Sequence, residues 1–346
     1  MSGVLRIGVL GTARIAERAL LRPAREVSAV TVAAVAAREV SRAEAFALQH
    51  GIPTAHGSYD DLLADPDIDA VYLPLPNSLH APWMLRAIEA GKHVLCEKPF
   101  ASNAAEAADI AEAADGSGLA VMEAMHYRYH PLVQRMAELV RGGAIGAIRH
   151  VQCWTSWPIE DPADIRYDYA LGGGALMDGG CYALDCLRLT GGEASVTGAL
   201  ADPLPSPQHL VDRAAAARLE FTNGATGWFE SAFTREGEFR ADVHVIGDRG
   251  HLWLRNFILA HEGHLTVTRN GAVVVDEGPT DQDGGRGGDV GDTTFAWQLR
   301  VFAAAAQDGA PFATTAANAA RTMRLIDEAY QAAGLPPRGS VEAAAE

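Results

Sequence analysis

Between residues 4 and 124, apolar runs with the length of strands alternate with segments whose composition favours helices. The apolar runs are Leu5–Leu10, Val30–Ala36, Ala70–Leu75, His93–Cys96 and Leu119–Glu123, and the helical segments between them are Ala13–Leu21, Ser41–His50, Pro82–Ala90 and Asn103–Ala114. Continuous apolar runs are typical of parallel strands that are buried on both faces, and crossover helices connect such strands. We therefore expect a doubly wound α/β domain over residues 1–124.

The pattern changes beyond residue 150, where apolar and polar residues alternate in short runs. These runs are Ala216–Phe221, Ala225–Phe233, Asp242–Ile246, His251–Leu254 and Leu265–Thr268. An Asn223-Gly224 pair between two of them favours a tight hairpin, because glycine adopts positive φ without steric cost. Residues 125–346 are thus predicted to form an α+β domain with an antiparallel sheet.

The end of this second domain has its own signals. Residues Asp276–Asp292 are rich in glycine and aspartate and are predicted to form a flexible loop. Helices are expected over Thr294–Gln307 and Thr314–Ala333, and these C-terminal helices could pack back on the first domain.

Composition excludes several classes of protein. The chain has 28 Lys plus Arg against 44 Asp plus Glu, a formal charge of −16, which repels nucleic acid and anionic lipid. No apolar run approaches the roughly 20 residues of a membrane span. The N-terminus lacks the features of a secretory signal, and the four cysteines fit free thiols, so a cytoplasmic location is expected.

The first strand leads directly into Gly11-Thr12-Ala13-Arg14-Ile15-Ala16, where a dinucleotide-binding fingerprint would lie. Gly11 permits the tight turn, and the small residues at 13 and 16 would let a pyrophosphate approach the helix N-terminus. Two of the three usual glycines are alanine, and the alternative is an ordinary strand–helix turn.

The second strand ends at Ala37-Arg38, where an NAD-selective enzyme usually has an acidic residue for the ribose hydroxyls. A guanidinium at Arg38, with Ser41 and Arg42 just beyond, suits the 2′-phosphate of NADP. The alternative is that Arg38 is a solvated surface residue, and NAD is then the alternative cofactor.

Two further positions suggest catalysis. Lys98 follows the strand His93–Cys96 at the carboxyl edge of the sheet, where open α/β sheets bind ligands, although a lone lysine there could be a surface charge. Downstream of a glycine run, Asp178, Tyr182 and Asp185 stand at i, i+4 and i+7 and would share one helical face. Such a stripe could bind a polyol and relay its proton; the alternative is a helix-dipole aspartate and a packed tyrosine.

Four motifs together resemble the Gfo/Idh/MocA family of oxidoreductases over nearly the whole chain. They are the Gly11–Ala16 turn, Leu75-Pro76-Asn77-Ser78-Leu79-His80, the run Ala90-Gly91-Lys92-His93-Val94-Leu95-Cys96-Glu97-Lys98-Pro99, and Gly174–Tyr182. The resemblance implies an N-terminal Rossmann domain and a C-terminal domain whose open, mainly antiparallel sheet commonly forms homodimers or homotetramers. The implied activity is nicotinamide-dependent redox chemistry on sugars, cyclitols and related diols.

The resemblance also implies roles for individual residues. Lys98 would contact the substrate and the nicotinamide ribose, Asp178 would bind substrate, and Tyr182 would be the acid/base. Cofactor contacts are expected from the matching turn and strand-end residues, which are Gly11, Thr12, Ala13, Arg14, Ile15, Leu75, Pro76, Asn77, His80 and Glu97. A structural role is the alternative for His80.

Tyrosine at position 182 distinguishes branches of this family. Inositol dehydrogenases carry histidine there, whereas tyrosine resembles the glucose-fructose oxidoreductase, xylose dehydrogenase and dimeric dihydrodiol dehydrogenase branches, which commonly favour NADP. Because an unperturbed tyrosine has a pKa near 10, the base needs a nearby cation, for which Lys98 is the candidate.

The remaining expectations concern the substrate side. Arg128 lies in a segment that resembles the family's crossing between domains and is expected to line the cleft, while Trp157, Arg166 and Asp185 are expected to border the substrate. No metal is expected, because the histidine pairs 126/130 and 261/264 lack a third ligand.

The rival to an enzyme is a catalytically silent dinucleotide sensor with the same fold. A sensor needs no acid/base pair, so the joint presence of Lys98, Asp178 and Tyr182 favours catalysis.

Overall fold

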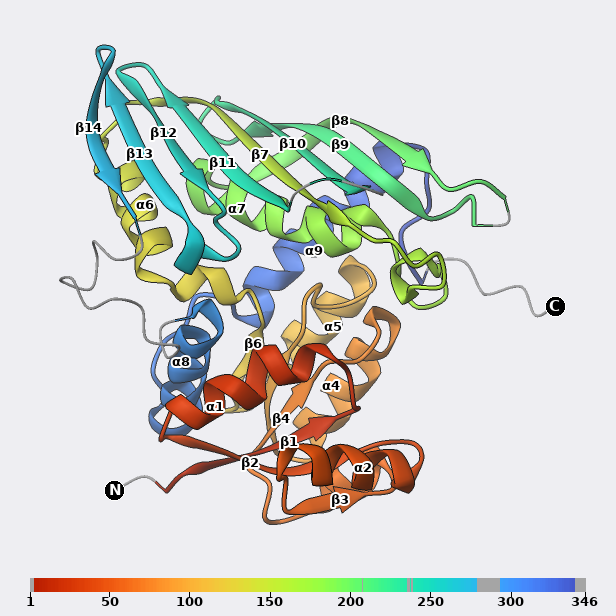
Figure 1. The fold of residues 1–346 in the computed structure, drawn as a ribbon. Helices are drawn as coiled ribbons and strands as arrows, with labels where there is room; N and C mark the ends of the chain where they lie inside the picture. Colours follow the sequence, from red (N-terminus) through yellow and green to blue (C-terminus); the bar gives the residue numbers. More distant parts are fainter. Residues whose placement is uncertain (1–2, 207, 235–236, 238, 279–292, 340–346) are drawn as a thin grey trace. The chain divides into compact units, whose positions relative to one another are not determined.

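A computed structural model describes residues 3–206, 208–234, 237, 239–278 and 293–339 (Figure 1). The chain forms two compact units. The first comprises residues 1–101, 105–126 and 290–320, and the second comprises residues 102–104, 127–289 and 321–346. The segment 290–320 therefore packs with the N-terminal part of the chain, although it follows the entire second sheet in sequence.

The first unit contains a six-stranded parallel sheet with the order β3-β2-β1-β4-β5-β6. Its strands are β1 (Leu5–Leu10), β2 (Val30–Ala36), β3 (Thr54–His56), β4 (Ala70–Leu73), β5 (His93–Cys96) and β6 (Val121–Glu123). The strand order reverses between β1 and β4, which confirms the predicted doubly wound sheet. Ligands of such sheets bind outside the carboxyl ends of the strands at this switch point.

Helices join these strands, as the alternating sequence pattern predicts. They are the π-helical turn η1 (Glu17–Leu21), α1 (Arg22–Glu26), α2 (Val40–His50), α3 (Tyr59–Ala64), the 3₁₀ turn η2 (Asn77–Leu79), α4 (His80–Glu89) and α5 (Ala104–Ala114). The helix α8 (Thr294–Asp308) also belongs to this unit, although it follows the second sheet in sequence. The Ser58 side chain caps α3 by accepting from the Asp61 amide, and Gly51 ends α2 with a left-handed φ of 71°. In the same unit α8 packs against α1 and β1.

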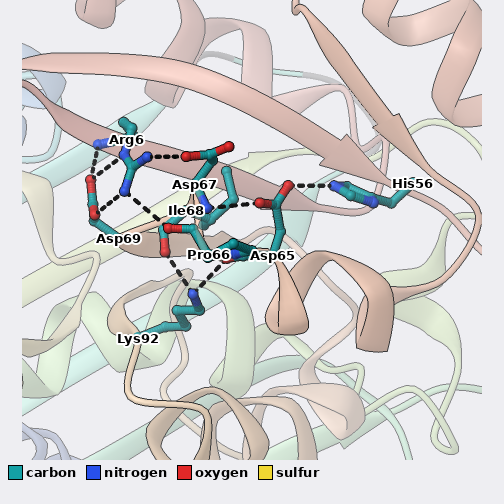
Figure 2. A network of polar contacts seen from close by, with 8 residues as sticks. All are labelled: Arg6, His56, Asp65, Pro66, Asp67, Ile68, Asp69 and Lys92. Atoms are coloured by element: carbon teal, nitrogen blue, oxygen red, sulfur yellow. Dashed lines mark hydrogen bonds and ion pairs between the residues drawn. The ribbon is translucent and has the colours of Figure 1, made fainter.

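A polar network secures the loop that leads into β4 (Figure 2). The guanidinium and backbone amide of Arg6 at the start of β1 donate to the Asp69 carboxylate at 2.8–3.0 Å. The Lys92 ammonium, which precedes β5, donates to the carbonyl oxygens of Asp65 and Ile68 at 2.8 and 2.7 Å. The network lies at the amino ends of β1, β4 and β5, so it fixes the edge of the sheet opposite the ligand-binding edge.

The second unit contains an open eight-stranded sheet with the order β14-β13-β12-β11-β7-β10-β9-β8. Its strands are β7 (Ile148–Pro158), β8 (Ala194–Pro203), β9 (Asp212–Phe221), β10 (Thr226–Thr234), β11 (Arg240–Gly247), β12 (Gly250–Arg255), β13 (His264–Arg269) and β14 (Ala272–Glu277). Among these strands only β7 and β10 pair in parallel, so the predicted antiparallel character is confirmed. The predicted hairpin at Asn223-Gly224 joins β9 and β10, with Gly224 at a φ of 81°.

The predicted loop over Asp276–Asp292 is wrong at its start, because Asp276 and Glu277 pair with β13 as part of β14. Four apolar or small residues from position 272 onward extend this edge strand into the acidic stretch. The rest of the predicted loop, residues 279–292, lies outside the described residues.

The second unit also contains helical segments, several of which pack on its sheet. They are η3 (His126–Tyr129), α6 (Pro131–Arg141), η4 (Ile165–Tyr167), the π-helical turn η5 (Leu176–Gly180), α7 (Cys181–Gly191), η6 (Ala260–Glu262) and α9 (Ala316–Ala332), whose first residues belong to the first unit. The buried residues Val151 and Cys153 of β7 alternate with half-buried Gln152 and Trp154, and α7 packs on β7 and β10 (Figure 1). The opposite face carries Trp154, whose ring lies 5.8 Å from that of Trp228.

Candidate active site

The turn after β1 has the backbone geometry that the predicted fingerprint requires. Gly11 has a φ of 99°, and a Cβ atom there would lie 3.1 Å from the Leu75 side chain and 3.7 Å from the Tyr59 hydroxyl. Leu75 follows β4, so the structure brings the predicted residues Gly11 and Leu75 together at the switch point. The helix begins at Ile15 rather than at Ala13, and the exposed Arg14 and Ile15 lie at its start.

The predicted 2′-phosphate residues lie beside this turn. Arg38, Ser41 and Arg42 are all exposed, and the Arg42 guanidinium lies 3.4 Å from the Thr12 hydroxyl. Among the residues that the structure describes, neither arginine has an acidic partner. One of these guanidinium groups thus follows the end of β2 and the other lies in the first turn of α2.

Tyr59 belongs to the same group, and the sequence reasoning missed it. Its hydroxyl faces Gly11, burial raises the pKa of its phenol, and the positive charges of Arg38 and Arg42 oppose that rise. Its ring packs edge-on against Trp83 at 4.8 Å. No motif marks this residue, because its place depends on α3 folding back toward β1.

The Glu-Lys-Pro segment follows β5 at the same edge of the sheet. The Tyr72 hydroxyl donates to the Glu97 carboxylate at 2.7 Å, so the carboxylate is held from β4, the neighbouring strand. Lys98 is half-buried between the buried residues Glu97 and Pro99, and Pro76 and Asn77 are half-buried after β4. The segment is thus built on the strand ends where the sequence placed it.

His80, for which the sequence left a cofactor contact and a structural role open, has a backbone carbonyl oxygen beside each ring nitrogen. His80 is fully buried, its Nδ1 lies 2.8 Å from the Pro99 carbonyl oxygen, and its Nε2 lies 2.9 Å from the Leu75 carbonyl oxygen. Burial lowers the pKa of His80 to about 4, so the ring is neutral at physiological pH. A neutral imidazole carries one N–H, so it donates to one of these two carbonyl oxygens, and the buried ring lies between the segments that follow β4 and β5.

In the second unit, Asp178 lies in the π-helical turn η5 with a fixed carboxylate. Its Oδ2 accepts from Trp157 Nε1 at 3.1 Å and from Arg166 Nε at 2.8 Å. Arg166 is held in turn by Asp164 at 3.1 Å, and the charge of Asp178 is the largest of the influences that raise the Arg166 pKa. The structure therefore brings together three predicted substrate-side residues, Asp178, Trp157 and Arg166.

The glycines beside Asp178 allow this close packing. A Cβ atom at Gly179 would lie 2.4 Å from the Ser231 hydroxyl and 3.1 Å from the Trp157 ring, so no side chain fits there. Phe239, which the sequence reasoning also missed, stacks on Trp157 with 5.6 Å between ring centroids and is 40% exposed.

The predicted stripe of Asp178, Tyr182 and Asp185 is divided by the structure. Asp178 lies in a π-helical turn, whereas Tyr182 and Asp185 lie in α7, so their i, i+4 and i+7 spacing does not describe one regular helical face. Tyr182 is 5% exposed. π-helical turns inside helices occur frequently at functional sites.

Asp185, which is expected to border the substrate, has two side-chain partners in this structure. Asp185 is fully buried and accepts from the Tyr127 hydroxyl at 2.5 Å and from Arg128 Nη1 at 2.9 and 3.0 Å. The positive charge of Arg128 lowers the pKa of Asp185 although burial acts to raise it. Asp185 is therefore an ionised partner of two neighbouring side chains.

The histidines considered as metal pairs have other partners: His126 Nδ1 lies 2.8 Å from the Thr294 hydroxyl, and His130 caps α6. No cluster of three metal-ligating side chains occurs among the described residues. Within the same part of the chain, no helix has the length and hydropathy that crossing a membrane requires.

Comparisons with known proteins identify the family. The family model described as "Oxidoreductase family, NAD-binding Rossmann fold" matches residues 5–125, and the Gfo/Idh/MocA C-terminal domain model matches residues 133–253. The chain belongs to the Gfo/Idh/MocA family. It is therefore a nicotinamide-dependent oxidoreductase, as the sequence predicts.

Relatives agree with the predicted branches. A D-xylose 1-dehydrogenase (NADP(+)) of Haloferax volcanii is 37% identical over 95% of this chain and 97% of its own length. A trans-1,2-dihydrobenzene-1,2-diol dehydrogenase of Xenopus laevis is 39% identical over 46% of this chain and 48% of its own. The crystal structure of a 3-ketoreductase from Actinomadura kijaniata with NADP and TDP-benzene matches with a TM-score of 0.82 and 30% identity, over 95% of this chain and 97% of that one. These relatives are named as enzymes, so they give no support to the sensor alternative.

Proposed function

We propose that this oxidoreductase transfers a hydride between NADP and a carbinol or carbonyl carbon of a small uncharged sugar or related diol. The observation that carries the proposal is the fixed Asp178 carboxylate one helical turn before Tyr182, on a unit joined to a dinucleotide-type sheet. The cofactor would supply the hydride acceptor or donor, and the chain's residues would bind, orient and exchange the proton.

The first domain, which we assign to residues 1–124, would hold the cofactor. Gly11 has the positive φ of a tight turn, and Arg38 and Arg42 lack acidic partners among the described residues, so both features fit NADP. The name of the xylose dehydrogenase relative includes NADP(+), in agreement with this assignment. An acidic residue at position 38 would instead favour NAD.

Tyr182 would act as the acid/base. In the oxidative direction its phenolate accepts the hydroxyl proton of the substrate while the carbinol carbon loses its hydride, and the same proton returns in reduction. Lys98 would stabilise the phenolate and the developing alkoxide by its positive charge, and Asp178 would orient the reacting or the adjacent hydroxyl.

Charge near Asp178 favours an uncharged substrate. Glu160, Asp161, Asp164 and Asp168 lie on either side of Arg166, and Asp164 and Asp178 already engage the Arg166 guanidinium. A phosphate or diphosphate beside Asp178 would be repelled by this segment. Free aldoses and diols therefore fit this site better than the nucleotide-linked sugars on which some relatives act.

The second domain, which we assign to residues 125–346 apart from the segment that packs in the first unit, would also form a homodimer or homotetramer through the uncovered face of its sheet. That face carries three tryptophans, Trp154, Trp228 and Trp253, and a depression of about 590 Å³ lined by residues of β7 to β10. Half-exposed aromatic side chains on a sheet are typical of an interface. All four cysteines are buried free thiols, which supports a cytoplasmic location.

The proposal is tested by the absorbance of reduced nicotinamide when the protein is mixed with NADP or NAD and a panel of aldoses, cyclitols, aromatic dihydrodiols and sugar phosphates. We expect turnover with NADP and one uncharged class, and loss of turnover in Lys98→Met. Equal activity on sugar phosphates would contradict the proposal that the substrate is uncharged. No turnover with any member of the panel, with cofactor binding intact, would favour the alternative of a dinucleotide sensor.

A further inference from the structure

The buried Tyr127 and Asp185 and the half-buried Arg128 form a hydrogen-bonded group that contacts Tyr182 in the second unit. The Tyr127 hydroxyl donates to Asp185 Oδ2 at 2.5 Å, and Arg128 Nη1 donates to both oxygens of Asp185. The Tyr127 ring packs edge-on against the Tyr182 ring, with 6.0 Å between centroids and 62° between planes. The hydrogen bond and the ring contact thus connect Tyr127 to two residues of α7 that are three positions apart.

Tyr127 has little freedom to move within this group. Its side chain is fully buried, its other neighbour Phe257 packs edge-on at 5.0 Å, and its hydroxyl is tied to a carboxylate that Arg128 holds in turn. Edge-to-face aromatic pairs contribute about 0.5–1.5 kcal/mol beyond their buried area and prefer specific angles. The Tyr127 ring, held by its hydroxyl and by Phe257, can therefore define the orientation of the Tyr182 ring that it contacts.

The electrostatics of the group disfavour a proton-transfer role for Tyr127. Burial and the charge of Asp185 raise the pKa of Tyr127 well above its usual value of 10, while Arg128 lowers the pKa of Asp185. At physiological pH the group therefore contains a neutral phenol, a carboxylate and a guanidinium, and the two charges balance. Nothing in the group exchanges a proton near neutral pH.

We propose that Tyr127 and Asp185 are positioning residues that fix the ring of Tyr182 for proton transfer. The inference rests on the proposed function, because it assumes that the Tyr182 hydroxyl reacts. It explains why a fully buried carboxylate lies three residues after Tyr182, where sequence spacing suggested a substrate ligand. A reacting hydroxyl held in one orientation avoids the loss of rate that small misplacements cause.

The test compares Tyr127→Phe with the wild-type protein. The substitution keeps the ring and leaves Asp185 paired with Arg128, so the fold should persist. We expect kcat to fall by about tenfold while KM for NADP stays unchanged, because about 1 Å of misplacement can cost up to about 100-fold in rate. Fluorotyrosine placed at position 182 should show faster ring flipping by ¹⁹F NMR in Tyr127→Phe, and this readout does not depend on activity.

Tyr330→Phe is the matched control. The Tyr330 hydroxyl donates to Asp212 at 2.7 Å, and Asp212 is paired with Arg338, so the same three groups occur around α9. This control should leave the ¹⁹F signal at position 182 unchanged. An unchanged ring signal in Tyr127→Phe, or an equal change in Tyr330→Phe, would overturn the inference; absence of turnover in the wild-type protein would instead overturn the proposed function.

Asp185→Asn supplies a second readout. Removing the carboxylate charge leaves the positive charge of Arg128 unbalanced near Tyr182, which favours the ionised form of the reacting phenol. The acid limb of the pH–rate profile for oxidation should therefore move to lower pH in this variant. A purely structural role for Asp185 would lower the rate at every pH without moving the profile, and that result would contradict the inference.

Discussion

The Nδ1 atom of His80 lies 2.8 Å from the carbonyl oxygen of Pro99, the residue directly after Lys98. The other ring nitrogen lies 2.9 Å from the Leu75 carbonyl oxygen, so one buried imidazole bridges the segments that follow β4 and β5. These segments carry the residues expected to meet the nicotinamide end of the cofactor. The segment that carries Lys98 thus lies against a fully buried histidine.

His80 should make stability depend on pH. Its pKa is lowered from 6.5 to about 4 in the folded protein, so the unfolded chain binds a proton first as the pH falls between these values. The free energy of unfolding should decrease over this window by up to about 3 kcal/mol on account of His80. Urea unfolding at several pH values measures this free energy for the wild-type protein and for His80→Gln. If the free energy of unfolding depends on pH in the same way for both proteins, the prediction is contradicted.

Arg38→Asp should change cofactor preference. The substitution removes a guanidinium that suits the 2′-phosphate and places a carboxylate where it can bind ribose hydroxyls. We expect KM for NADP to rise about 10- to 100-fold, because the variant loses one or two charge-assisted contacts with the phosphate. KM for NAD should change far less. Equal losses for the two cofactors would show that Arg38 does not read the phosphate.

Arg166→Lys should weaken substrate binding without affecting the cofactor. A lysine keeps the charge but cannot donate to Asp164 and Asp178 in the planar geometry of a guanidinium. The expected result is a rise of about tenfold in substrate KM with KM for NADP unchanged. Arg213→Lys, at an exposed pair with Asp202, is the control; a similar effect in both variants would contradict a specific role.

Trp228→Glu should disrupt association of subunits. The residue lies on the uncovered sheet face beside Trp154, and a buried unpaired carboxylate at an interface is costly. Light scattering with size-exclusion chromatography should give a smaller particle for the variant than for the wild-type protein. Equal masses, both above that of one chain, would place the interface elsewhere.

Much of the first sheet could be predicted because its signals are local. Leu5–Leu10 and Val30–Ala36 are apolar enough to indicate buried strands, and both were predicted with the bounds that the structure shows. Thr54–His56 was missed because one exposed and two half-buried residues give no periodicity. β7 was missed because half-buried Gln152 and Trp154 break the apolar run.

The site residues divide in the same way. The segments containing Lys98 and Asp178 could be found from motifs at a strand end and after a glycine run, because local sequence sets those positions. The partners of Asp185 and His80 could not be predicted, because Tyr127 and Pro99 meet them across 58 and 19 residues of sequence. Spacing indicates which residues share a helix, and only the folded chain shows what each side chain contacts.

The most direct test of the account follows a deuterium label. The aldose or diol that gives the highest rate is prepared with deuterium on its reacting carbon, incubated with NADP and the protein, and the reduced nicotinamide is analysed by mass spectrometry. We predict that the wild-type protein transfers the label to the nicotinamide, and that Tyr182→Phe binds NADP equally well but transfers at least about 100-fold more slowly. Transfer by Tyr182→Phe at the wild-type rate would contradict the account.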